Sequence, residues 1–149
     1  LDFDFQKVTE QSKDNPVFYV QYAHARVASM LRAAAAEGVA ADDSALADAD
    51  LSRLAHPAQL ALAKKVAEWP RQVELAAHHH EPHRIAFFLY DLAGAFHALY
   101  NLGRDEPALR VVQADDPEGS RARLALSRAV AVVIAAGLGI LGVAPADEM

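Results

Sequence analysis

Apolar residues recur at spacings of three and four positions between Asn15 and Gly38, the period of an α-helix. Asn15 can cap a helix, and Pro16 suits the first helical position because no hydrogen bond is lost there. Gly38 is a typical residue just beyond a helix end. The pattern therefore predicts a helix between Asn15 and Gly38, whose core stripe is Val17, Val20, His24, Val27 and Leu31.

Tyr19, Tyr22 and Arg26 form a second stripe on this predicted helix, centred about 150° from the apolar one. Two phenol rings and a guanidinium group on one face can stack on unpaired bases and donate hydrogen bonds to their edges. The same face can instead pack on another helix, with Arg26 paired to an acidic neighbour. Residue spacing leaves both interpretations open.

Proline and glycine divide the rest of the chain into further helices. The stretches 39–50 and 105–116 lack helical periodicity and are expected to be loops. No strand pattern of sufficient length follows residue 6, so the predicted fold class is all-α, a helix bundle. The predicted helices run from His56-Pro57 to the residue before Pro70, from Pro70 to about His80, from Glu81-Pro82 to about Leu102 with Gly103 as its stop, and from near Gly119 to Gly137.

The helix predicted after Pro82 has an apolar stripe and an opposite side of mixed character. Phe96 belongs to the apolar stripe but lies in its last turns, so it is either core filler or a ring at the rim of a binding surface. The apolar stripe is Ile85, Phe88, Leu89, Leu92, Phe96 and Leu99, and the opposite side is Tyr90, Gly94, His97 and Asn101.

Composition narrows the possible functions. A chain of 149 residues with 53% hydrophobic residues and no cysteine is expected to be one globular, cytoplasmic domain. Ser127 and Arg128 interrupt the long apolar stretch 124–143, which argues against a membrane span. The net charge of −6 disfavours a DNA-binding protein or any reader that depends on phosphate contacts. RNA, if bound, would be recognised through its exposed bases.

Candidate chemistry is limited to a run of histidines. On one helix His79 and His83 could share a metal at i, i+4 spacing, whereas consecutive histidines point about 100° apart. No repeated Glu-x-x-His set accompanies them, so a solvated helix end is the preferred interpretation of 78–83. No phosphate-binding glycine loop or nucleophile set occurs either. The chain itself is predicted to be non-catalytic and to hold no metal or cofactor.

Three segments, in the same order, resemble the C-terminal helical domain of arginyl-tRNA synthetases, a class I family. The resemblance covers most of the chain and is weakest at 39–50 and 105–120, and the chain ends in Glu148-Met149 as many members do. The literal Asp-Ala-Leu-Arg tetrapeptide of the domain's name is absent. The segments are NPVFYVQYAHAR (15–26), EPHRIAFFLYDLAGAFHALYN (81–101) and ARLALSRAVAVVIAAGLGILGV (122–143).

The resemblance implies a DALR-type anticodon-binding helix bundle over residues 15–149, preceded by a connector over 1–14 from a catalytic domain. It implies that the tRNA(Arg) anticodon loop and that catalytic domain are the partners, and that ATP is used only by the catalytic domain. The alternative is a helical protein-interaction or interdomain docking module without RNA contact. Carried over position by position, the anticodon-binding residues are Tyr19, Tyr22, Arg26, Phe96 and Met149.

Overall fold

The computed structural model describes residues 10, 12 and 14–149, so the predicted connector 1–14 lies largely outside the described part. Within these residues every regular element is an α-helix or a short 3₁₀ turn, which confirms the all-α prediction. Three long helices form the centre of the bundle: α2 (Pro16–Ala36), α6 (His83–Asp105) and α7 (Pro117–Ile140).

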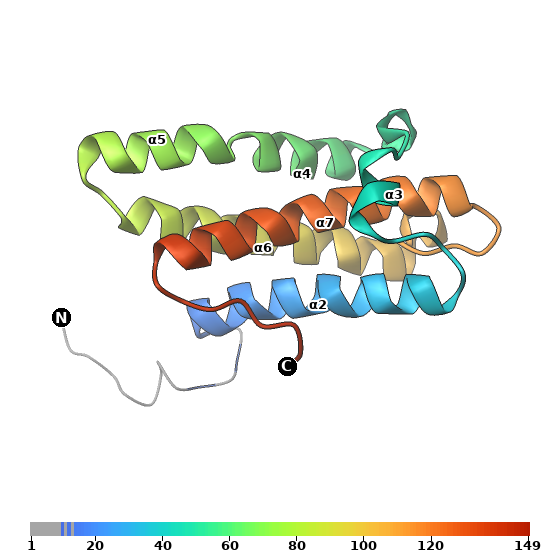
Figure 1. The fold of residues 1–149 in the computed structure, drawn as a ribbon, viewed down its shortest axis with the longest axis horizontal. Helices are drawn as coiled ribbons and strands as arrows, with labels where there is room; N and C mark the ends of the chain where they lie inside the picture. Colours follow the sequence, from blue (N-terminus) through green and yellow to red (C-terminus); the bar gives the residue numbers. More distant parts are fainter. Residues whose placement is uncertain (1–9, 11, 13) are drawn as a thin grey trace.

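The remaining helices cover this centre. The two consecutive helices α4 (Pro57–Ala67) and α5 (Trp69–His79) lie end to end along α6, on the side away from α2 (Figure 1). The five-residue α3 (Asp43–Ala47) packs on α7. Helices α2 and α6 run in the same direction, and α7 runs against both (Figure 1). One side of the α2–α6 pair is thereby left without a covering helix from the described part of the chain.

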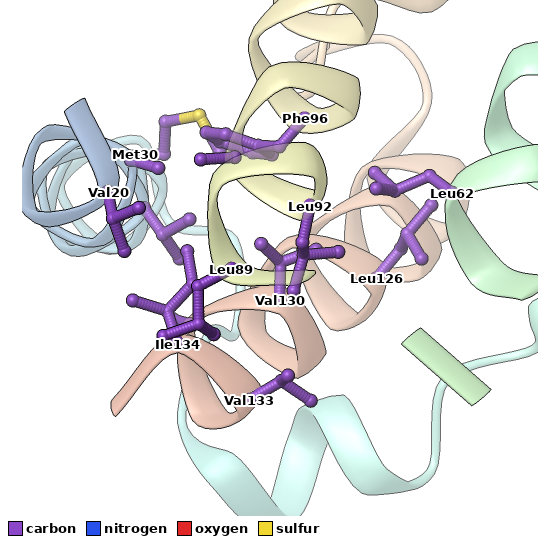
Figure 2. Close-up of a cluster of buried hydrophobic side chains, with 14 of the residues drawn as sticks. Val20, Met30, Leu62, Leu89, Leu92, Phe96, Leu126, Val130, Val133 and Ile134 are labelled. Atoms are coloured by element: carbon purple, nitrogen blue, oxygen red, sulfur yellow. The ribbon is translucent and has the colours of Figure 1, made fainter. Parts of the chain in front are cut away.

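The core lies where α2, α6 and α7 meet, and Figure 2 shows its side chains. Val20 of α2 points toward Leu89 of α6 and Ile134 of α7. Met30, further along α2, points toward Phe96 of α6, and all five side chains are buried. Burying such side chains is the main source of stability for a chain without disulfides or metals. The stripe prediction for α2 is confirmed at Val20, His24 and Val27 but was wrong for Val17, which is 47% exposed in the first turn, while Leu31 is half-buried.

Polar caps and prolines start α2 and α4 where the sequence predicts. The Asn15 side chain accepts from the backbone N–H groups of Val17 at 3.1 Å and Phe18 at 3.4 Å. His56 caps α4 in a reciprocal pair with Gln59. The last helix begins at Pro117 rather than near Gly119, because the Asp116 carboxylate caps it through the Gly119 N–H at 3.0 Å.

Two predicted helix ends were wrong. Gly103 and Gly137 are both inside helices, which continue to Asp105 and Ile140. The glycine that takes a left-handed conformation after α7 is Gly142, with φ of 73°. The predicted loop 39–50 contains α3, which Asp42 caps through the N–H groups of Ser44 and Ala45.

Helices α6 and α7 have the length and apolar content of membrane-crossing helices, with mean hydropathies of 1.2 and 1.7. Length and composition alone give weak evidence of that kind. Both helices pack against each other and against α2, and their apolar stripes supply much of the buried core. Packing within the bundle accounts for their hydropathy.

Candidate functional site

Tyr19, Tyr22 and Arg26 lie on the face of α2 that is turned toward α6. The ring of His97, on α6, is 4.8 Å from the Tyr19 ring and 5.6 Å from the Tyr22 ring, measured between centroids. The hydroxyl of Tyr19 reaches the position of Gly94, where an added Cβ would lie 3.9 Å from it. Tyr19, Tyr22 and Arg26 thus share one face of α2, as their spacing predicts, and this face is half-buried between two parallel helices.

Arg26 is the centre of this face. Its guanidinium carbon lies 4.5 Å from the centroid of the Tyr22 ring and 4.4 Å from that of Tyr100. One of its terminal nitrogens donates to the Tyr22 hydroxyl at 2.5 Å. No carboxylate of the described residues forms an ion pair with it. Cation–π contacts therefore hold the guanidinium in place without neutralising its charge.

His97 completes the contacts of Arg26. Its Nδ1 lies 3.4 Å from a terminal nitrogen of Arg26, and because a guanidinium group only donates, Nδ1 must accept. Burial lowers the pKa of His97, and the charge of Arg26 lowers this pKa further. His97 was predicted on the side of α6 opposite the core, yet only 7% of it is exposed. It acts as a neutral acceptor beneath the arginine.

The same packing between α2 and α6 determines the surroundings and the pKa of Tyr19. Its ring lies 5.2 Å from that of Tyr90, between centroids. Partial burial raises the pKa of Tyr19, the proximity of Tyr90 raises it further, and Arg26 opposes the shift. The phenol is therefore protonated at neutral pH and can donate a hydrogen bond.

Phe96 lies in the core, and 2% of it is exposed. Its ring contacts those of His97 and Tyr100, with centroids 5.6 and 6.5 Å away. In this structure its faces are not open to an incoming base, and it supports the two rings that contact Arg26. Of the two interpretations of Phe96, core filler describes its position.

Tyr100 is the site residue that sequence reasoning missed. It lies between the two stripes of α6, so neither the apolar pattern nor the opposite side selected it. Its spacing of three residues from His97 was the available signal, because residues at i and i+3 are neighbours on a helix.

The C-terminal tail, residues 144–149, lies along α2 and closes one end of the face (Figure 1). The Gln21 side chain donates to the carbonyl of Ala144 at 2.9 Å, and His24 Nδ1 donates to the carbonyl of Ala146 at 2.8 Å. His24 is thus buried as predicted, but its ring holds the tail. This brings Met149, 54% exposed, to a hollow that Arg26 also lines.

Two hollows open on either side of the Arg26 side chain. The first, about 450 Å³, lies toward the start of α2, and the second, about 340 Å³, lies under the C-terminal tail. Tyr22 and Arg26 line both, so four of the five predicted residues, all except Phe96, border one or both hollows. The first is lined by Ser12, Phe18, Tyr19, Tyr22, Arg26, His97 and Asn101, and the second by Tyr22, Ala25, Arg26, Ser29, Met30, Arg32, Tyr100, Asp147, Glu148 and Met149.

This arrangement suits the binding of flat, polar-edged ligands. Aromatic rings give stacking surfaces, and an arginine without a carboxylate partner gives directed donors to base edges or phosphates. Within the described residues, no three His, Cys, Asp or Glu side chains are placed to hold a metal ion. His79 ends α5 and His83 begins α6, and His80 between them has a left-handed backbone, so the i, i+4 geometry required for that metal site does not form.

The chain is similar over its whole length to arginine–tRNA ligases of known sequence or structure. It is 66% identical to the arginine–tRNA ligase of Paracoccus denitrificans and 64% identical to that of Roseobacter denitrificans, over all 149 residues and 26% of each relative. The solved arginyl-tRNA synthetase of Thermus thermophilus superposes with a TM-score of 0.78 at 34% identity, over the whole of this chain and 24% of that one.

The chain thus spans about a quarter of the length of the curated relatives that it matches. A family model described as the DALR anticodon binding domain matches residues 20–149, which include α2 from Val20 onward, all of α6 and α7, and the C-terminal tail. This chain belongs to the DALR anticodon-binding domain family.

Proposed function

We propose that this chain is the anticodon-recognition module of an arginine–tRNA ligase. It binds the anticodon loop of tRNA(Arg) and positions that tRNA for aminoacylation by a catalytic domain outside this chain, which uses ATP. The module works in the cytoplasm and carries out no chemistry itself. The observation that supports this most is Arg26, which is held between Tyr22 and Tyr100, is bordered by two hollows, and has no carboxylate partner among the described residues.

The genetic code gives a reason for one strict pocket, since every arginine anticodon has cytosine at its centre while the flanking bases vary. In the proposal, the loop unstacks and the central cytosine enters the hollow between Arg26 and Met149. Arg26 then donates to the acceptor edge of the base, while Tyr19 and Tyr22 support the neighbouring bases. Phe96 contributes from below by supporting Tyr100 and His97.

Substitution of Arg26 tests the proposal in the full-length protein. Affinities of tRNA(Arg) transcripts with the natural or a substituted central cytosine are measured for wild type, Arg26→Ala and Arg71→Ala. We expect Arg26→Ala to remove about 1–3 kcal/mol of discrimination between the transcripts. Arg71 is the matched control, because it is an exposed arginine on α5 outside both hollows.

Equal affinity of the wild-type protein for both transcripts would contradict the proposal. An Arg26→Ala protein that keeps its tRNA selectivity but loses stability or association with a partner would favour the docking module instead.

A further inference from the structure

Some lysine and arginine side chains of the described residues form no ion pair, and their positive charge is available to a ligand. Most arginines pair with a carboxylate, as Arg128 does with Asp43 at 2.8 Å and Arg123 with Asp116 at 3.2 Å. Such pairs leave little positive charge for a ligand. Among the described lysines and arginines, those without an ion pair are Arg26, Lys64, Arg71, Arg104 and Arg110.

Arg104 and Arg110 line a third hollow of about 460 Å³. This hollow shares Met30 and Tyr100 with the hollow under the C-terminal tail, which in turn shares Arg26 with the first. The three hollows therefore form one row along the α2–α6 pair. Between Tyr19 and Ala33 of α2 the row is about 21 Å long, at 1.5 Å per residue, which is enough for several nucleotides.

Local structure holds both arginines at this place. Arg104 lies one turn after Tyr100 on α6, so the two side chains share a face. Arg110 follows the 3₁₀ turn Pro107–Leu109, which approaches α6 at Gly103. A Cβ at Gly103 would lie 3.0 Å from the carbonyl oxygen of Leu109, so a side chain there would push this segment away. The Gln113 side chain fixes the segment further by donating to the carbonyl of Arg110 at 3.0 Å.

The lining of the third hollow fits one nucleotide. Met30, Tyr100, Val111 and Val112 give this hollow an apolar and aromatic lining for a base. Arg104 and Arg110 line the same hollow and carry the cationic groups that a phosphate needs. Among the described residues, those that line this hollow include no carboxylate. In a protein of net charge −6, that is a place where a polyanion meets no repulsion from the hollow's own side chains.

We propose that the third hollow binds a nucleotide of the tRNA anticodon loop that lies outside the central cytosine pocket. Arg104 and Arg110 hold its phosphate, and the Tyr100 side of the hollow receives its base. This inference rests on the proposed function above. Phosphate contacts carry no sequence information, so the hollow adds affinity and fixes the register of the loop while Arg26 supplies selectivity.

The test measures binding of the full-length protein to tRNA(Arg) transcripts over a range of salt concentrations. The variants are Arg104→Ala/Arg110→Ala, the charge-preserving Arg104→Lys/Arg110→Lys, and the control Arg71→Ala. We expect the double alanine variant to bind more weakly, with the slope of log affinity against log salt reduced by about 0.7, the contribution of the one single-strand phosphate that the two arginines hold. The preference for a central cytosine should be unchanged, and the lysine variant should keep most of the slope.

The outcomes separate this inference from the proposed function. If the wild-type protein prefers a central cytosine but the double alanine variant keeps its affinity and salt slope, the third hollow does not hold RNA and the proposed function stands. If the wild-type protein shows no preference, both fail. A drop in the melting temperature of the double alanine variant with no change of slope also overturns the inference, because both arginines are exposed and should not affect folding.

Discussion

His97 links the charge of Arg26 to the packing of α6. A charged imidazole here would face a guanidinium group from a buried position, and both effects favour the neutral ring. The neutral ring can accept from Arg26, so burial of the histidine keeps the arginine oriented. The contribution of His97 to stability should therefore depend on pH.

The pKa of His97 is below 6.5 in the folded state and close to 6.5 in the unfolded state. Below pH 6.5 the unfolded chain binds the extra proton, so stability falls as the pH drops toward the folded pKa. We expect His97→Gln to remove this part of the acid sensitivity. The measurement is the free energy of unfolding in urea between pH 7.5 and 5.

The exposed His79 supplies the control, since His79→Gln should leave the pH dependence of wild type intact. Parallel loss of stability in wild type and His97→Gln would show that the pKa of His97 is the same in both states.

Residue spacing predicted the part of the candidate site that lies on a single helix. Tyr19, Tyr22 and Arg26 share a face because of helical geometry alone. Whether that face met solvent or another helix depended on where α6 lies, and a single helix pattern carries no such information. The family resemblance gave Met149 as an anticodon-binding residue. The hydrogen bonds of Gln21 and His24 to the tail carbonyls explain how the tail brings Met149 to a hollow that Arg26 also lines.

At the scale of helices, the predicted helix ends were inaccurate where they relied on glycine. Gly103 and Gly137 look like helix stops in the sequence, yet each is a point of close packing inside a helix. Proline and capping residues were better guides, because their effects on the backbone are local. The five-residue α3 was missed because it is too short to show a period.

Gly137 of α7 packs against Leu89 of α6, and an added Cβ would lie 2.7 Å from a methyl group of Leu89. Leu89 is fully buried and has little room to move. We expect Gly137→Ala to destabilise the fold by about 1 kcal/mol, because overpacking of about 1–3 kcal/mol outweighs the gain in helix propensity of about 1 kcal/mol. Denaturant unfolding of the chain measures this difference.

Gly139→Ala is the matched control on the same helix, since nothing lies within 4 Å of its added Cβ. It should be neutral or stabilising. Equal effects of the two substitutions would mean that Gly137 is not a packing contact.

Across the whole molecule, the net charge of −6 is compatible with RNA binding because acidic side chains are largely absent from the row of hollows. The exception is the tail, where Asp147 and Glu148 line the central hollow. A carboxylate oxygen of Asp147 lies 3.4 Å from Nδ1 of His24. A carboxylate oxygen of Glu148 lies 3.9 Å from a terminal nitrogen of Arg32, at the exposed edge of α2. These two carboxylates would face the RNA together with Met149.

The tail is held mainly through its backbone, since Gln21 and His24 bind the carbonyls of Ala144 and Ala146. Its position should therefore survive loss of the acidic charges but not loss of its last residues. We expect Asp147→Asn/Glu148→Gln to keep the central-cytosine preference and to strengthen tRNA binding at low salt, because two negative charges near the phosphates are removed.

Deleting residues 147–149 should weaken that preference, because Met149 no longer closes the hollow beside Arg26. Affinities of the full-length variants for natural and substituted transcripts measure both effects, and loss of preference in the charge-neutral variant would show that the carboxylates, rather than the backbone contacts, place the tail.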